Sequence, residues 1–213
     1  MCWNKDVSFN TFLFSIFILI LIIYNNNYTQ YKIEEINNIF AYIFLLSFIL
    51  MQLIEYFLWQ NLNDKFYNKL LSFCASSLLF IQPIASIFVI KNIKERNIFL
   101  FIYLLFALPY SLYGLMNINF TTSVAKNGHL KWDWINKDHT YIGIGYLFYL
   151  FFLFYPLVRE KLYFSSLLAF ILLLISFYTF YKDGTADSMW CWSVNLIMLY
   201  FAVKLLIYLP FFK

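Results

Sequence analysis

Seven long apolar stretches, separated by short polar gaps, dominate this sequence. About 20 consecutive apolar residues form a helix that crosses the hydrocarbon core of a bilayer. Only 12% of the residues are charged, against roughly 25% in an average soluble domain. The stretches are apolar on all sides, whereas strands of a membrane barrel alternate between lipid-facing and lumen-facing positions. The sequence therefore predicts an all-α fold, a polytopic membrane bundle of about seven transmembrane helices.

The predicted spans leave almost no residues for a soluble domain, so a single integral membrane domain over residues 1–213 is expected. The first stretch is too long for a signal peptide and lacks the small residues of a cleavage site, so we expect it to be retained. The seven spans are expected near 7–24, 37–59, 70–90, 97–116, 141–158, 162–181 and 189–212.

The orientation is predicted from lysine and arginine, which are enriched in cytoplasmic loops. Seven spans define a side A with the loops near 25–36, 91–96 and 159–161 and the C-terminus, and a side B with the N-terminus and the loops near 60–69, 117–140 and 182–188. Each side carries seven basic residues. The two tightest basic turns, 91–96 and 159–161, both lie on side A. We therefore expect side A, with the C-terminus, to be cytoplasmic.

Glu55 and Lys204 are the only charged residues inside the predicted spans. An ionisable group in hydrocarbon is costly and indicates a functional site by default. At 1.5 Å per helical residue, Glu55 lies roughly 8 Å from side B and Lys204 roughly 24 Å from it. An axial separation of about 16 Å is too long for an ion pair. The two charges are therefore predicted not to pair with each other.

Glu55 is the stronger indication of a site, because a short carboxylate cannot reach the headgroups easily. Gln52 and Trp59 lie three and four residues from it, on the same helix face. Further polar side chains are expected at similar depth beneath side B, and they are Asn10 and Thr11 of the first span and Asn195 of the seventh. Gln82 lies on a small and polar stripe of the third span. Two interpretations stay open: structural hydrogen bonding, or a polar site centred on Glu55 and open to side B.

Lys204 lies close enough to the C-terminus for its long side chain to reach the headgroups of side A. The alternative is a retinal-binding lysine on the seventh helix, a chemistry that requires a carboxylate counter-ion. The third span, where such an acid would be expected, contains none. Retinal binding is therefore the lesser alternative.

The longest loop, near 117–140, contains both histidines, His129 and His139. Their spacing matches no closed metal site, so neither a metal centre nor another cofactor is predicted, and these two are the only candidate ligands. Trp132 and Trp134 of this loop are predicted to belong to an interfacial aromatic belt. The net charge of +4 is spread over both sides, which argues against a nucleic-acid partner.

Cys2 and Cys191 both lie on side B, each flanked by methionine and tryptophan. If side B is lumenal, these cysteines could form a disulfide between the N-terminus and the seventh helix. If side B is cytoplasmic, they are expected to stay reduced. Cys74 is predicted to be a packing residue inside the third span.

Several short motifs of these same segments support a resemblance to a known family. They are Met1-Cys2-Trp3, Met51–Trp59, Gln82-Pro83, Gly128-His129-Leu130 and Ser188–Trp192. Together they resemble a family of multi-pass membrane proteins from large, mimivirus-like DNA viruses and some protists. The resemblance implies a viral or host membrane and carries over no catalytic residues.

The resulting hypothesis is a virus-encoded, multi-pass integral membrane protein whose partner is the lipid bilayer and whose residues assign no activity. The alternative is a membrane enzyme or transporter that uses the Glu55 site. It lacks the histidines and aspartates that zinc-dependent lipid hydrolases of seven helices carry inside the membrane. The small-molecule ligand and the oligomeric state are left open by the sequence.

Overall fold

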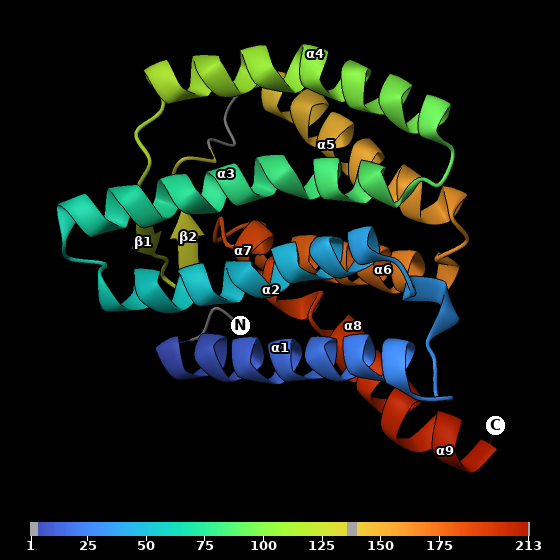
Figure 1. The fold of residues 1–213 in the computed structure, drawn as a ribbon. Helices are drawn as coiled ribbons and strands as arrows, with labels where there is room; N and C mark the ends of the chain where they lie inside the picture. Colours follow the sequence, from blue (N-terminus) through green and yellow to red (C-terminus); the bar gives the residue numbers. More distant parts are fainter. Residues whose placement is uncertain (1–3, 136–139, 213) are drawn as a thin grey trace.

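The computed structural model describes residues 4–135 and 140–212 and consists mainly of long helices (Figure 1). Six helices in this part of the chain are long and apolar enough to cross a membrane, and the described part of a seventh, 145–159, is a shorter apolar helix. The prediction of an all-α membrane bundle is confirmed. The helices are α1 (Lys5–Tyr28), α2 (Ile39–Gln60), α3 (Lys65–Val89), α4 (Ile93–Asn117), α5 (Thr140–Arg159), α6 (Tyr163–Phe180), α7 (Ala186–Ser193), α8 (Leu196–Val203) and α9 (Leu209–Phe212).

The first four helices begin at asparagine or aspartate residues, whose side chains accept hydrogen bonds from the first free backbone N–H groups. These N-cap residues are Asn4, Asn38, Asp64 and Asn92. Each one stands within about seven residues of the start of a long apolar stretch. Local sequence therefore sets the start of these helices, and the apolar length that follows sets their span.

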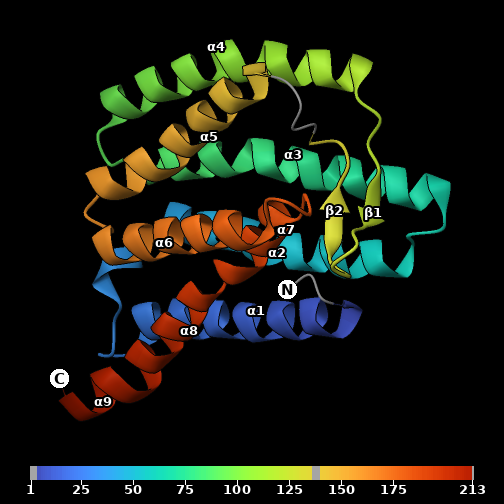
Figure 2. The same cartoon turned by 180° about the vertical axis from the view of Figure 1, so that it is seen from behind.

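Helices α1, α2, α3, α4 and α6 run roughly along one axis, and α5 crosses it obliquely (Figure 1). Helices α2 and α3 form a hairpin in the middle, with α1 packed on α2 and α5 packed on α3. Helices α6 and α7 pack against each other, and α7 contacts α2 of this hairpin. Helix α8 crosses α1 (Figure 2). Helix α4 lies at the outer edge and contacts α3 and the aromatic side chains of α5. The bundle interior is therefore lined by α2, α3, α5, α6 and α7, with buried side chains of α1 and α8 completing the apolar core.

An apolar core fills the interior toward side A. Trp190 of α7 lies at its centre, with its ring near those of Phe48 and Phe154. Its indole N–H donates to the Ala169 carbonyl of α6 at 3.1 Å, which satisfies the one polar group of this large side chain. Trp190 therefore joins α2, α5 and α6 around α7.

The outer surface of the bundle is also apolar. Phe17 of α1, Phe101 of α4 and Leu167 of α6 are among the large hydrophobic side chains that point outward. A soluble monomer rarely exposes apolar patches of this extent. Hydrocarbon around the long helices removes the free-energy cost of exposing these apolar side chains to water. The chain is therefore an integral, multi-pass membrane protein.

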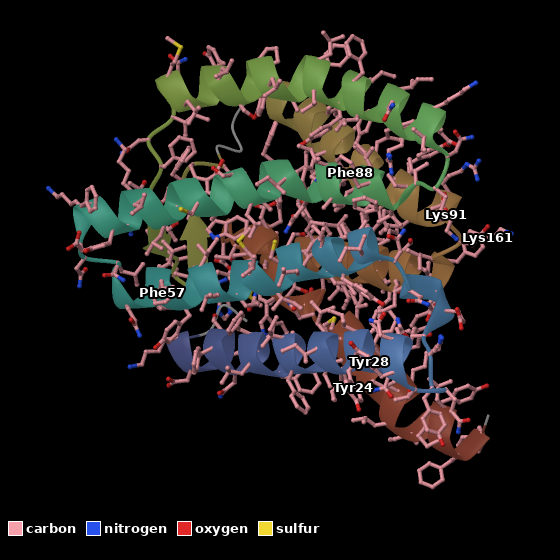
Figure 3. All side chains as sticks on the ribbon, viewed as in Figure 1. Tyr24, Tyr28, Phe57, Phe88, Lys91 and Lys161 are labelled. Atoms are coloured by element: carbon pink, nitrogen blue, oxygen red, sulfur yellow. The ribbon has the colours of Figure 1, made fainter. Side chains whose placement is uncertain are left out.

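The end of the bundle that corresponds to side A contains basic loops and an asparagine bracket. Lys91 and Lys161 lie at this end, away from Phe57 of α2, and Tyr24 and Tyr28 lie near the end of α1 (Figure 3). Between α1 and α2 is the 3₁₀ turn η1 (Glu34–Ile36). The buried Asn26 side chain accepts from the Ile33 N–H at 2.7 Å and donates to the Tyr42 hydroxyl at 2.8 Å. These bonds fix the loop that leads into η1.

The Lys204 side chain reaches this same loop. Its ammonium group forms an ion pair with Glu35 of η1 and also donates to the Tyr200 hydroxyl. The expected reach of Lys204 toward side A is confirmed, but a protein carboxylate receives the ammonium group.

Replacing Lys204 by Met should lower the free energy of unfolding by about 1 kcal/mol or less, because ion pairs near solvent contribute little. Both side chains of the pair are partly exposed. Unfolding in a denaturing detergent series measures the change. Comparison of the single variants Lys204→Met and Glu35→Gln with the double variant gives the coupling energy of the pair. A loss of several kcal/mol in Lys204→Met would contradict the assignment of a marginal surface pair.

The seventh span differs from the predicted continuous helix over 189–212. Helix α7 begins at Ala186 and ends at Ser193, and α8 starts only at Leu196. Between them, the N–H groups of Asn195 and Ile197 bond to carbonyls three residues earlier, which tightens the backbone into a 3₁₀ turn. A π-helical segment, Lys204–Tyr208, follows α8. The earlier start moves Asp187 from the predicted loop into the bundle.

Candidate functional site

Glu55 lies inside the bundle on the face of α2 that the sequence predicted. Its side chain is fully buried, as is that of Gln52. The Gln52 amide donates to a carboxylate oxygen of Glu55 at 3.0 Å. The three-residue spacing places both groups on one face of the helix. A polar centre therefore exists beneath side B at the predicted position.

A second acid, Asp187 of α7, belongs to the same region and was missed by the sequence analysis. It is only 7% exposed. Asp187 and Cys191 are one helical turn apart, and the buried Cys191 packs in a cluster with Met51 of α2, the helix that carries Glu55. The signal was present in the sequence as the i, i+4 spacing of Asp187, Cys191 and Asn195. It was overlooked because the span was started at residue 189.

Two tyrosines of α5 extend the cluster toward α3. The Tyr149 hydroxyl donates to the Gln82 carbonyl oxygen at 2.7 Å. Asp187 acts electrostatically on the hydroxyl groups of both Tyr146 and Tyr149. Gln82 therefore joins the cluster from α3, as the polar stripe of the third span suggested. Together, Gln52, Glu55, Gln82, Tyr146, Tyr149, Asp187 and Cys191 are called the acid cluster below.

Several polar atoms at or beside the acid cluster are buried and have no hydrogen-bond partner among the described residues. They are the carbonyl oxygen Oε1 of Gln52, the amide nitrogen Nε2 of Gln82 and the carbonyl oxygen Oδ1 of Asn195. Such atoms are expensive in a water-free interior. A bound proton carrier, cation or water would satisfy the oxygens. Asn195 also lies at the break between α7 and α8.

A short β-hairpin covers the side B end of the acid cluster. Strand β1 (Thr122–Val124) pairs antiparallel with β2 (Leu130–Trp132), and Thr122 lies opposite Trp132. Buried Asn68 of α3 accepts from the Thr122 N–H at 2.9 Å and donates to the Thr122 carbonyl at 2.8 Å. The Ser188 hydroxyl donates to the Leu130 carbonyl at 2.6 Å. The hairpin is thus fixed to α3 and α7.

Trp132 and Trp134 do not form the interfacial belt that the sequence predicted. They are 3% and 8% exposed, and their rings stack at 5.4 Å. The pair packs in a cluster with Met51 of α2 and Cys191 of α7. The belt prediction was wrong because the hairpin folds back over the bundle end and places both indoles inside. They separate the acid cluster from solvent on side B.

Asn10 lies away from Glu55, on the outer flank of α1. It lines a groove of about 280 Å³ between α1 and the α7–α8 segment, together with Asn195 and Trp192. The Trp192 indole donates to the Thr11 hydroxyl at 3.0 Å. Asn10, Thr11 and Asn195 therefore meet in this groove, but Glu55 and Gln52 do not line it, so the groove is not the predicted site around Glu55. Asn195 also lines an apolar interior cavity of about 40 Å³.

The remaining candidate residues of the sequence analysis are Cys2, His139, His129 and Lys204. Cys2 and His139 fall outside the described residues, and Cys191 is a buried, free thiol, so the structure gives no support to the Cys2–Cys191 disulfide, which stays a prediction. His129 lies in the hairpin, with its ring edge-on to Phe180. Within residues 4–135 and 140–212, no group of three or more histidine, cysteine, aspartate or glutamate residues is arranged to hold a metal ion. Lys204 lines neither the groove nor the interior cavity.

The stability of the hairpin end is expected to depend on pH through His129. Partial burial lowers the pKa of its imidazole below 6.5, and nearby Asp183 opposes this shift. The unfolded chain then binds the proton more tightly than the folded one, so the free energy of unfolding falls as the pH drops below about 6.5. His129→Gln should flatten this decrease in denaturation curves recorded across that window. An unchanged pH profile in the variant would contradict it.

Comparison with family models, with curated proteins and with solved structures finds no match to this chain. Function is therefore inferred from the arrangement of the side chains.

Proposed function

We propose that the chain is a proton-conducting or proton-coupled transport protein, in which the acid cluster carries the proton. The observation that carries the proposal is the burial of two acidic side chains from different helices, Glu55 of α2 and Asp187 of α7, inside the bundle. Acids held inside a membrane bundle are typical of proton relays in pumps and transporters. The interrupted seventh helix supports the same class, because transporters use broken helices at their binding sites.

The alternative of a thiol enzyme is less well supported by the surroundings of Cys191. Reactive cysteines lie beside cations and are partly exposed. Cys191 is instead fully buried and packs with Met51, Trp132 and Trp134. These surroundings do not suit nucleophilic chemistry.

The further proposals concern the setting of the protein. We propose that it is virus-encoded and resides in a viral or host membrane, which the resemblance of its motifs supports. The density of basic residues in the turns 91–96 and 159–161 supports a cytoplasmic side A. The acid cluster would then face the non-cytoplasmic side.

Proton movement in reconstituted vesicles tests the proposed function. Purified protein is placed in vesicles that contain a pH-sensitive dye, and a potassium gradient with valinomycin imposes a membrane potential. Dye acidification faster than in protein-free vesicles is expected. Equal rates with and without protein, for both directions of the potential, would overturn proton conduction.

A further inference from the structure

The two basic turns of side A lie side by side in the folded protein. The Lys91 backbone N–H donates to the Glu160 carboxylate at 3.0 Å, and the Arg159 Nε atom pairs with the Glu95 carboxylate at 3.0 Å. Figure 3 shows Lys91 and Lys161 at the same end of the bundle. The two turns therefore form one surface, called the basic patch below, which consists of Lys91, Lys94, Arg96, Arg159 and Lys161.

The number of cations in the basic patch reaches the range that acidic headgroups recognise. Clusters of four to eight lysines and arginines beside a membrane-spanning helix bind anionic lipids. The turn 91–96 has three such residues and the turn 159–161 has two, so neither turn reaches this range alone. Folding brings all five together, with only Glu95 and Glu160 as acids in the same turns.

The two arginines of the basic patch are engaged by the protein itself, whereas the three lysines are not. The Arg96 guanidinium lies 5.6 and 5.4 Å from the ring centres of Phe40 and Phe88, a cation–π arrangement. Arg159 is held by its ion pair. The three lysine side chains are exposed, and none of them forms an ion pair with another described residue. Their ammonium groups are therefore open to an external anion.

Lys161 has a backbone conformation that lysine disfavours. Its φ of 66° makes it the one described non-glycine residue in the left-handed region, where glycine is favoured because it has no Cβ atom. The Lys161 N–H bonds to the Val158 carbonyl and the Leu162 N–H to the Leu157 carbonyl. These two bonds define a helix-ending motif that usually has glycine at this position. Since the backbone favours glycine, the presence of lysine indicates a role for its charge.

Apolar side chains of α4 and α5 lie next to the basic patch. Ile98 and Val158, each within two residues of one of its arginines, are 58% and 46% exposed. The two helices meet there through Phe99 and Tyr155, whose rings stack at 4.7 Å. An occupant of the patch therefore contacts cations at one end and apolar helices at the other. This combination fits a lipid better than a free anion.

We propose that the basic patch binds the headgroup of an anionic phospholipid in the leaflet of side A. The lysine ammonium groups would contact the lipid phosphate, while the acyl chains lie along α4 and α5. The patch lies at the opposite end of the bundle from the acid cluster, so this proposal does not depend on the proposed proton transport.

The experiment measures lipid binding to the full chain by native mass spectrometry, from micelles with equal amounts of dioleoylphosphatidylglycerol and dioleoylphosphatidylcholine. The triple variant Lys91→Gln, Lys94→Gln, Lys161→Gln removes the three free charges. The matched control removes the same charge from three exposed lysines of side B, as Lys65→Gln, Lys69→Gln, Lys182→Gln. Glycerol 3-phosphate serves as a competitor that has the phosphate but no acyl chains.

Lys161→Gly separates the charge of this residue from its backbone. The variant should be at least as stable as wild type in neutral detergent, because glycine suits the left-handed region. It should nevertheless bind phosphatidylglycerol roughly fivefold more weakly, the effect of one cation near the membrane surface. Lys161→Arg, which keeps the charge, should bind like wild type.

Wild type and the side B control should prefer phosphatidylglycerol to phosphatidylcholine equally, and the triple variant should lose this preference by at least about tenfold. The proposal is overturned if wild type shows no preference, if the triple variant binds like wild type, or if the side B control loses as much. It is also overturned if Lys161→Gly binds like wild type, or if equimolar glycerol 3-phosphate displaces the lipid, because the site then recognises a free anion.

Discussion

Glu55→Gln is expected to reduce proton flux to the level of protein-free vesicles while the fold remains intact. Glutamine has the same length and can still accept the hydrogen bond that the Gln52 amide gives to Glu55, but it cannot carry a proton. Burying a charge costs free energy that burying a neutral amide of the same shape does not, so the free energy of unfolding should stay within about 1 kcal/mol of wild type or rise. Flux is read with the dye assay, and stability with a denaturing detergent series.

The control for this variant is Glu34→Gln, an equal change at an exposed position of η1. It should leave flux unchanged. Asp187→Asn should lower flux like Glu55→Gln, since both acids are buried inside the bundle. Wild-type flux in folded Glu55→Gln protein would remove Glu55 from the proton path, and loss of folding would assign it a structural role.

Asn68→Leu is expected to detach the hairpin from α3. It leaves two buried backbone groups of Thr122 without their partner, and each such group costs about 1–3 kcal/mol. The free energy of unfolding should therefore fall by roughly 2–5 kcal/mol. The fluorescence of the buried pair Trp132 and Trp134 should shift to longer wavelength as water reaches the indoles.

Asn117→Leu is the matched control, because this exposed asparagine only bonds back to the Tyr113 carbonyl of its own helix. Its stability should match that of wild type. If Asn68→Leu changes neither stability nor the fluorescence maximum, the hairpin is not held by the Asn68 bracket.

The spans were predictable because length and apolar composition decide which segments cross a bilayer. The boundaries of α2 and α5 differ from the predicted ones by two residues or fewer. The inward face of α2 was also predictable, since Gln52 and Glu55 share a helical spacing. The reach of the Lys204 side chain toward side A was predictable from its length alone. Its partner, Glu35, was not predictable.

The composition of the site was less accessible to sequence reasoning. The charge of Asp187 placed it outside the seventh span, whose predicted start was residue 189. Helix α7 begins three residues earlier, at Ala186, and therefore includes Asp187. The burial of Trp132 and Trp134 depends on a hairpin held by contacts more than 50 residues apart in the chain. Local pattern cannot indicate such contacts. Tertiary packing therefore decided which polar residues meet, and Asn10 was placed on the flank for the same reason.

The central claim is that Glu55 exchanges a proton inside the bundle. Infrared difference spectra of wild type and Glu55→Gln, recorded over a pH series in vesicles, measure this directly. The account predicts a carbonyl band of a protonated carboxylic acid that titrates in wild type, is absent in Glu55→Gln and titrates at a different pH in Asp187→Asn. A band that is identical in all three proteins would contradict it.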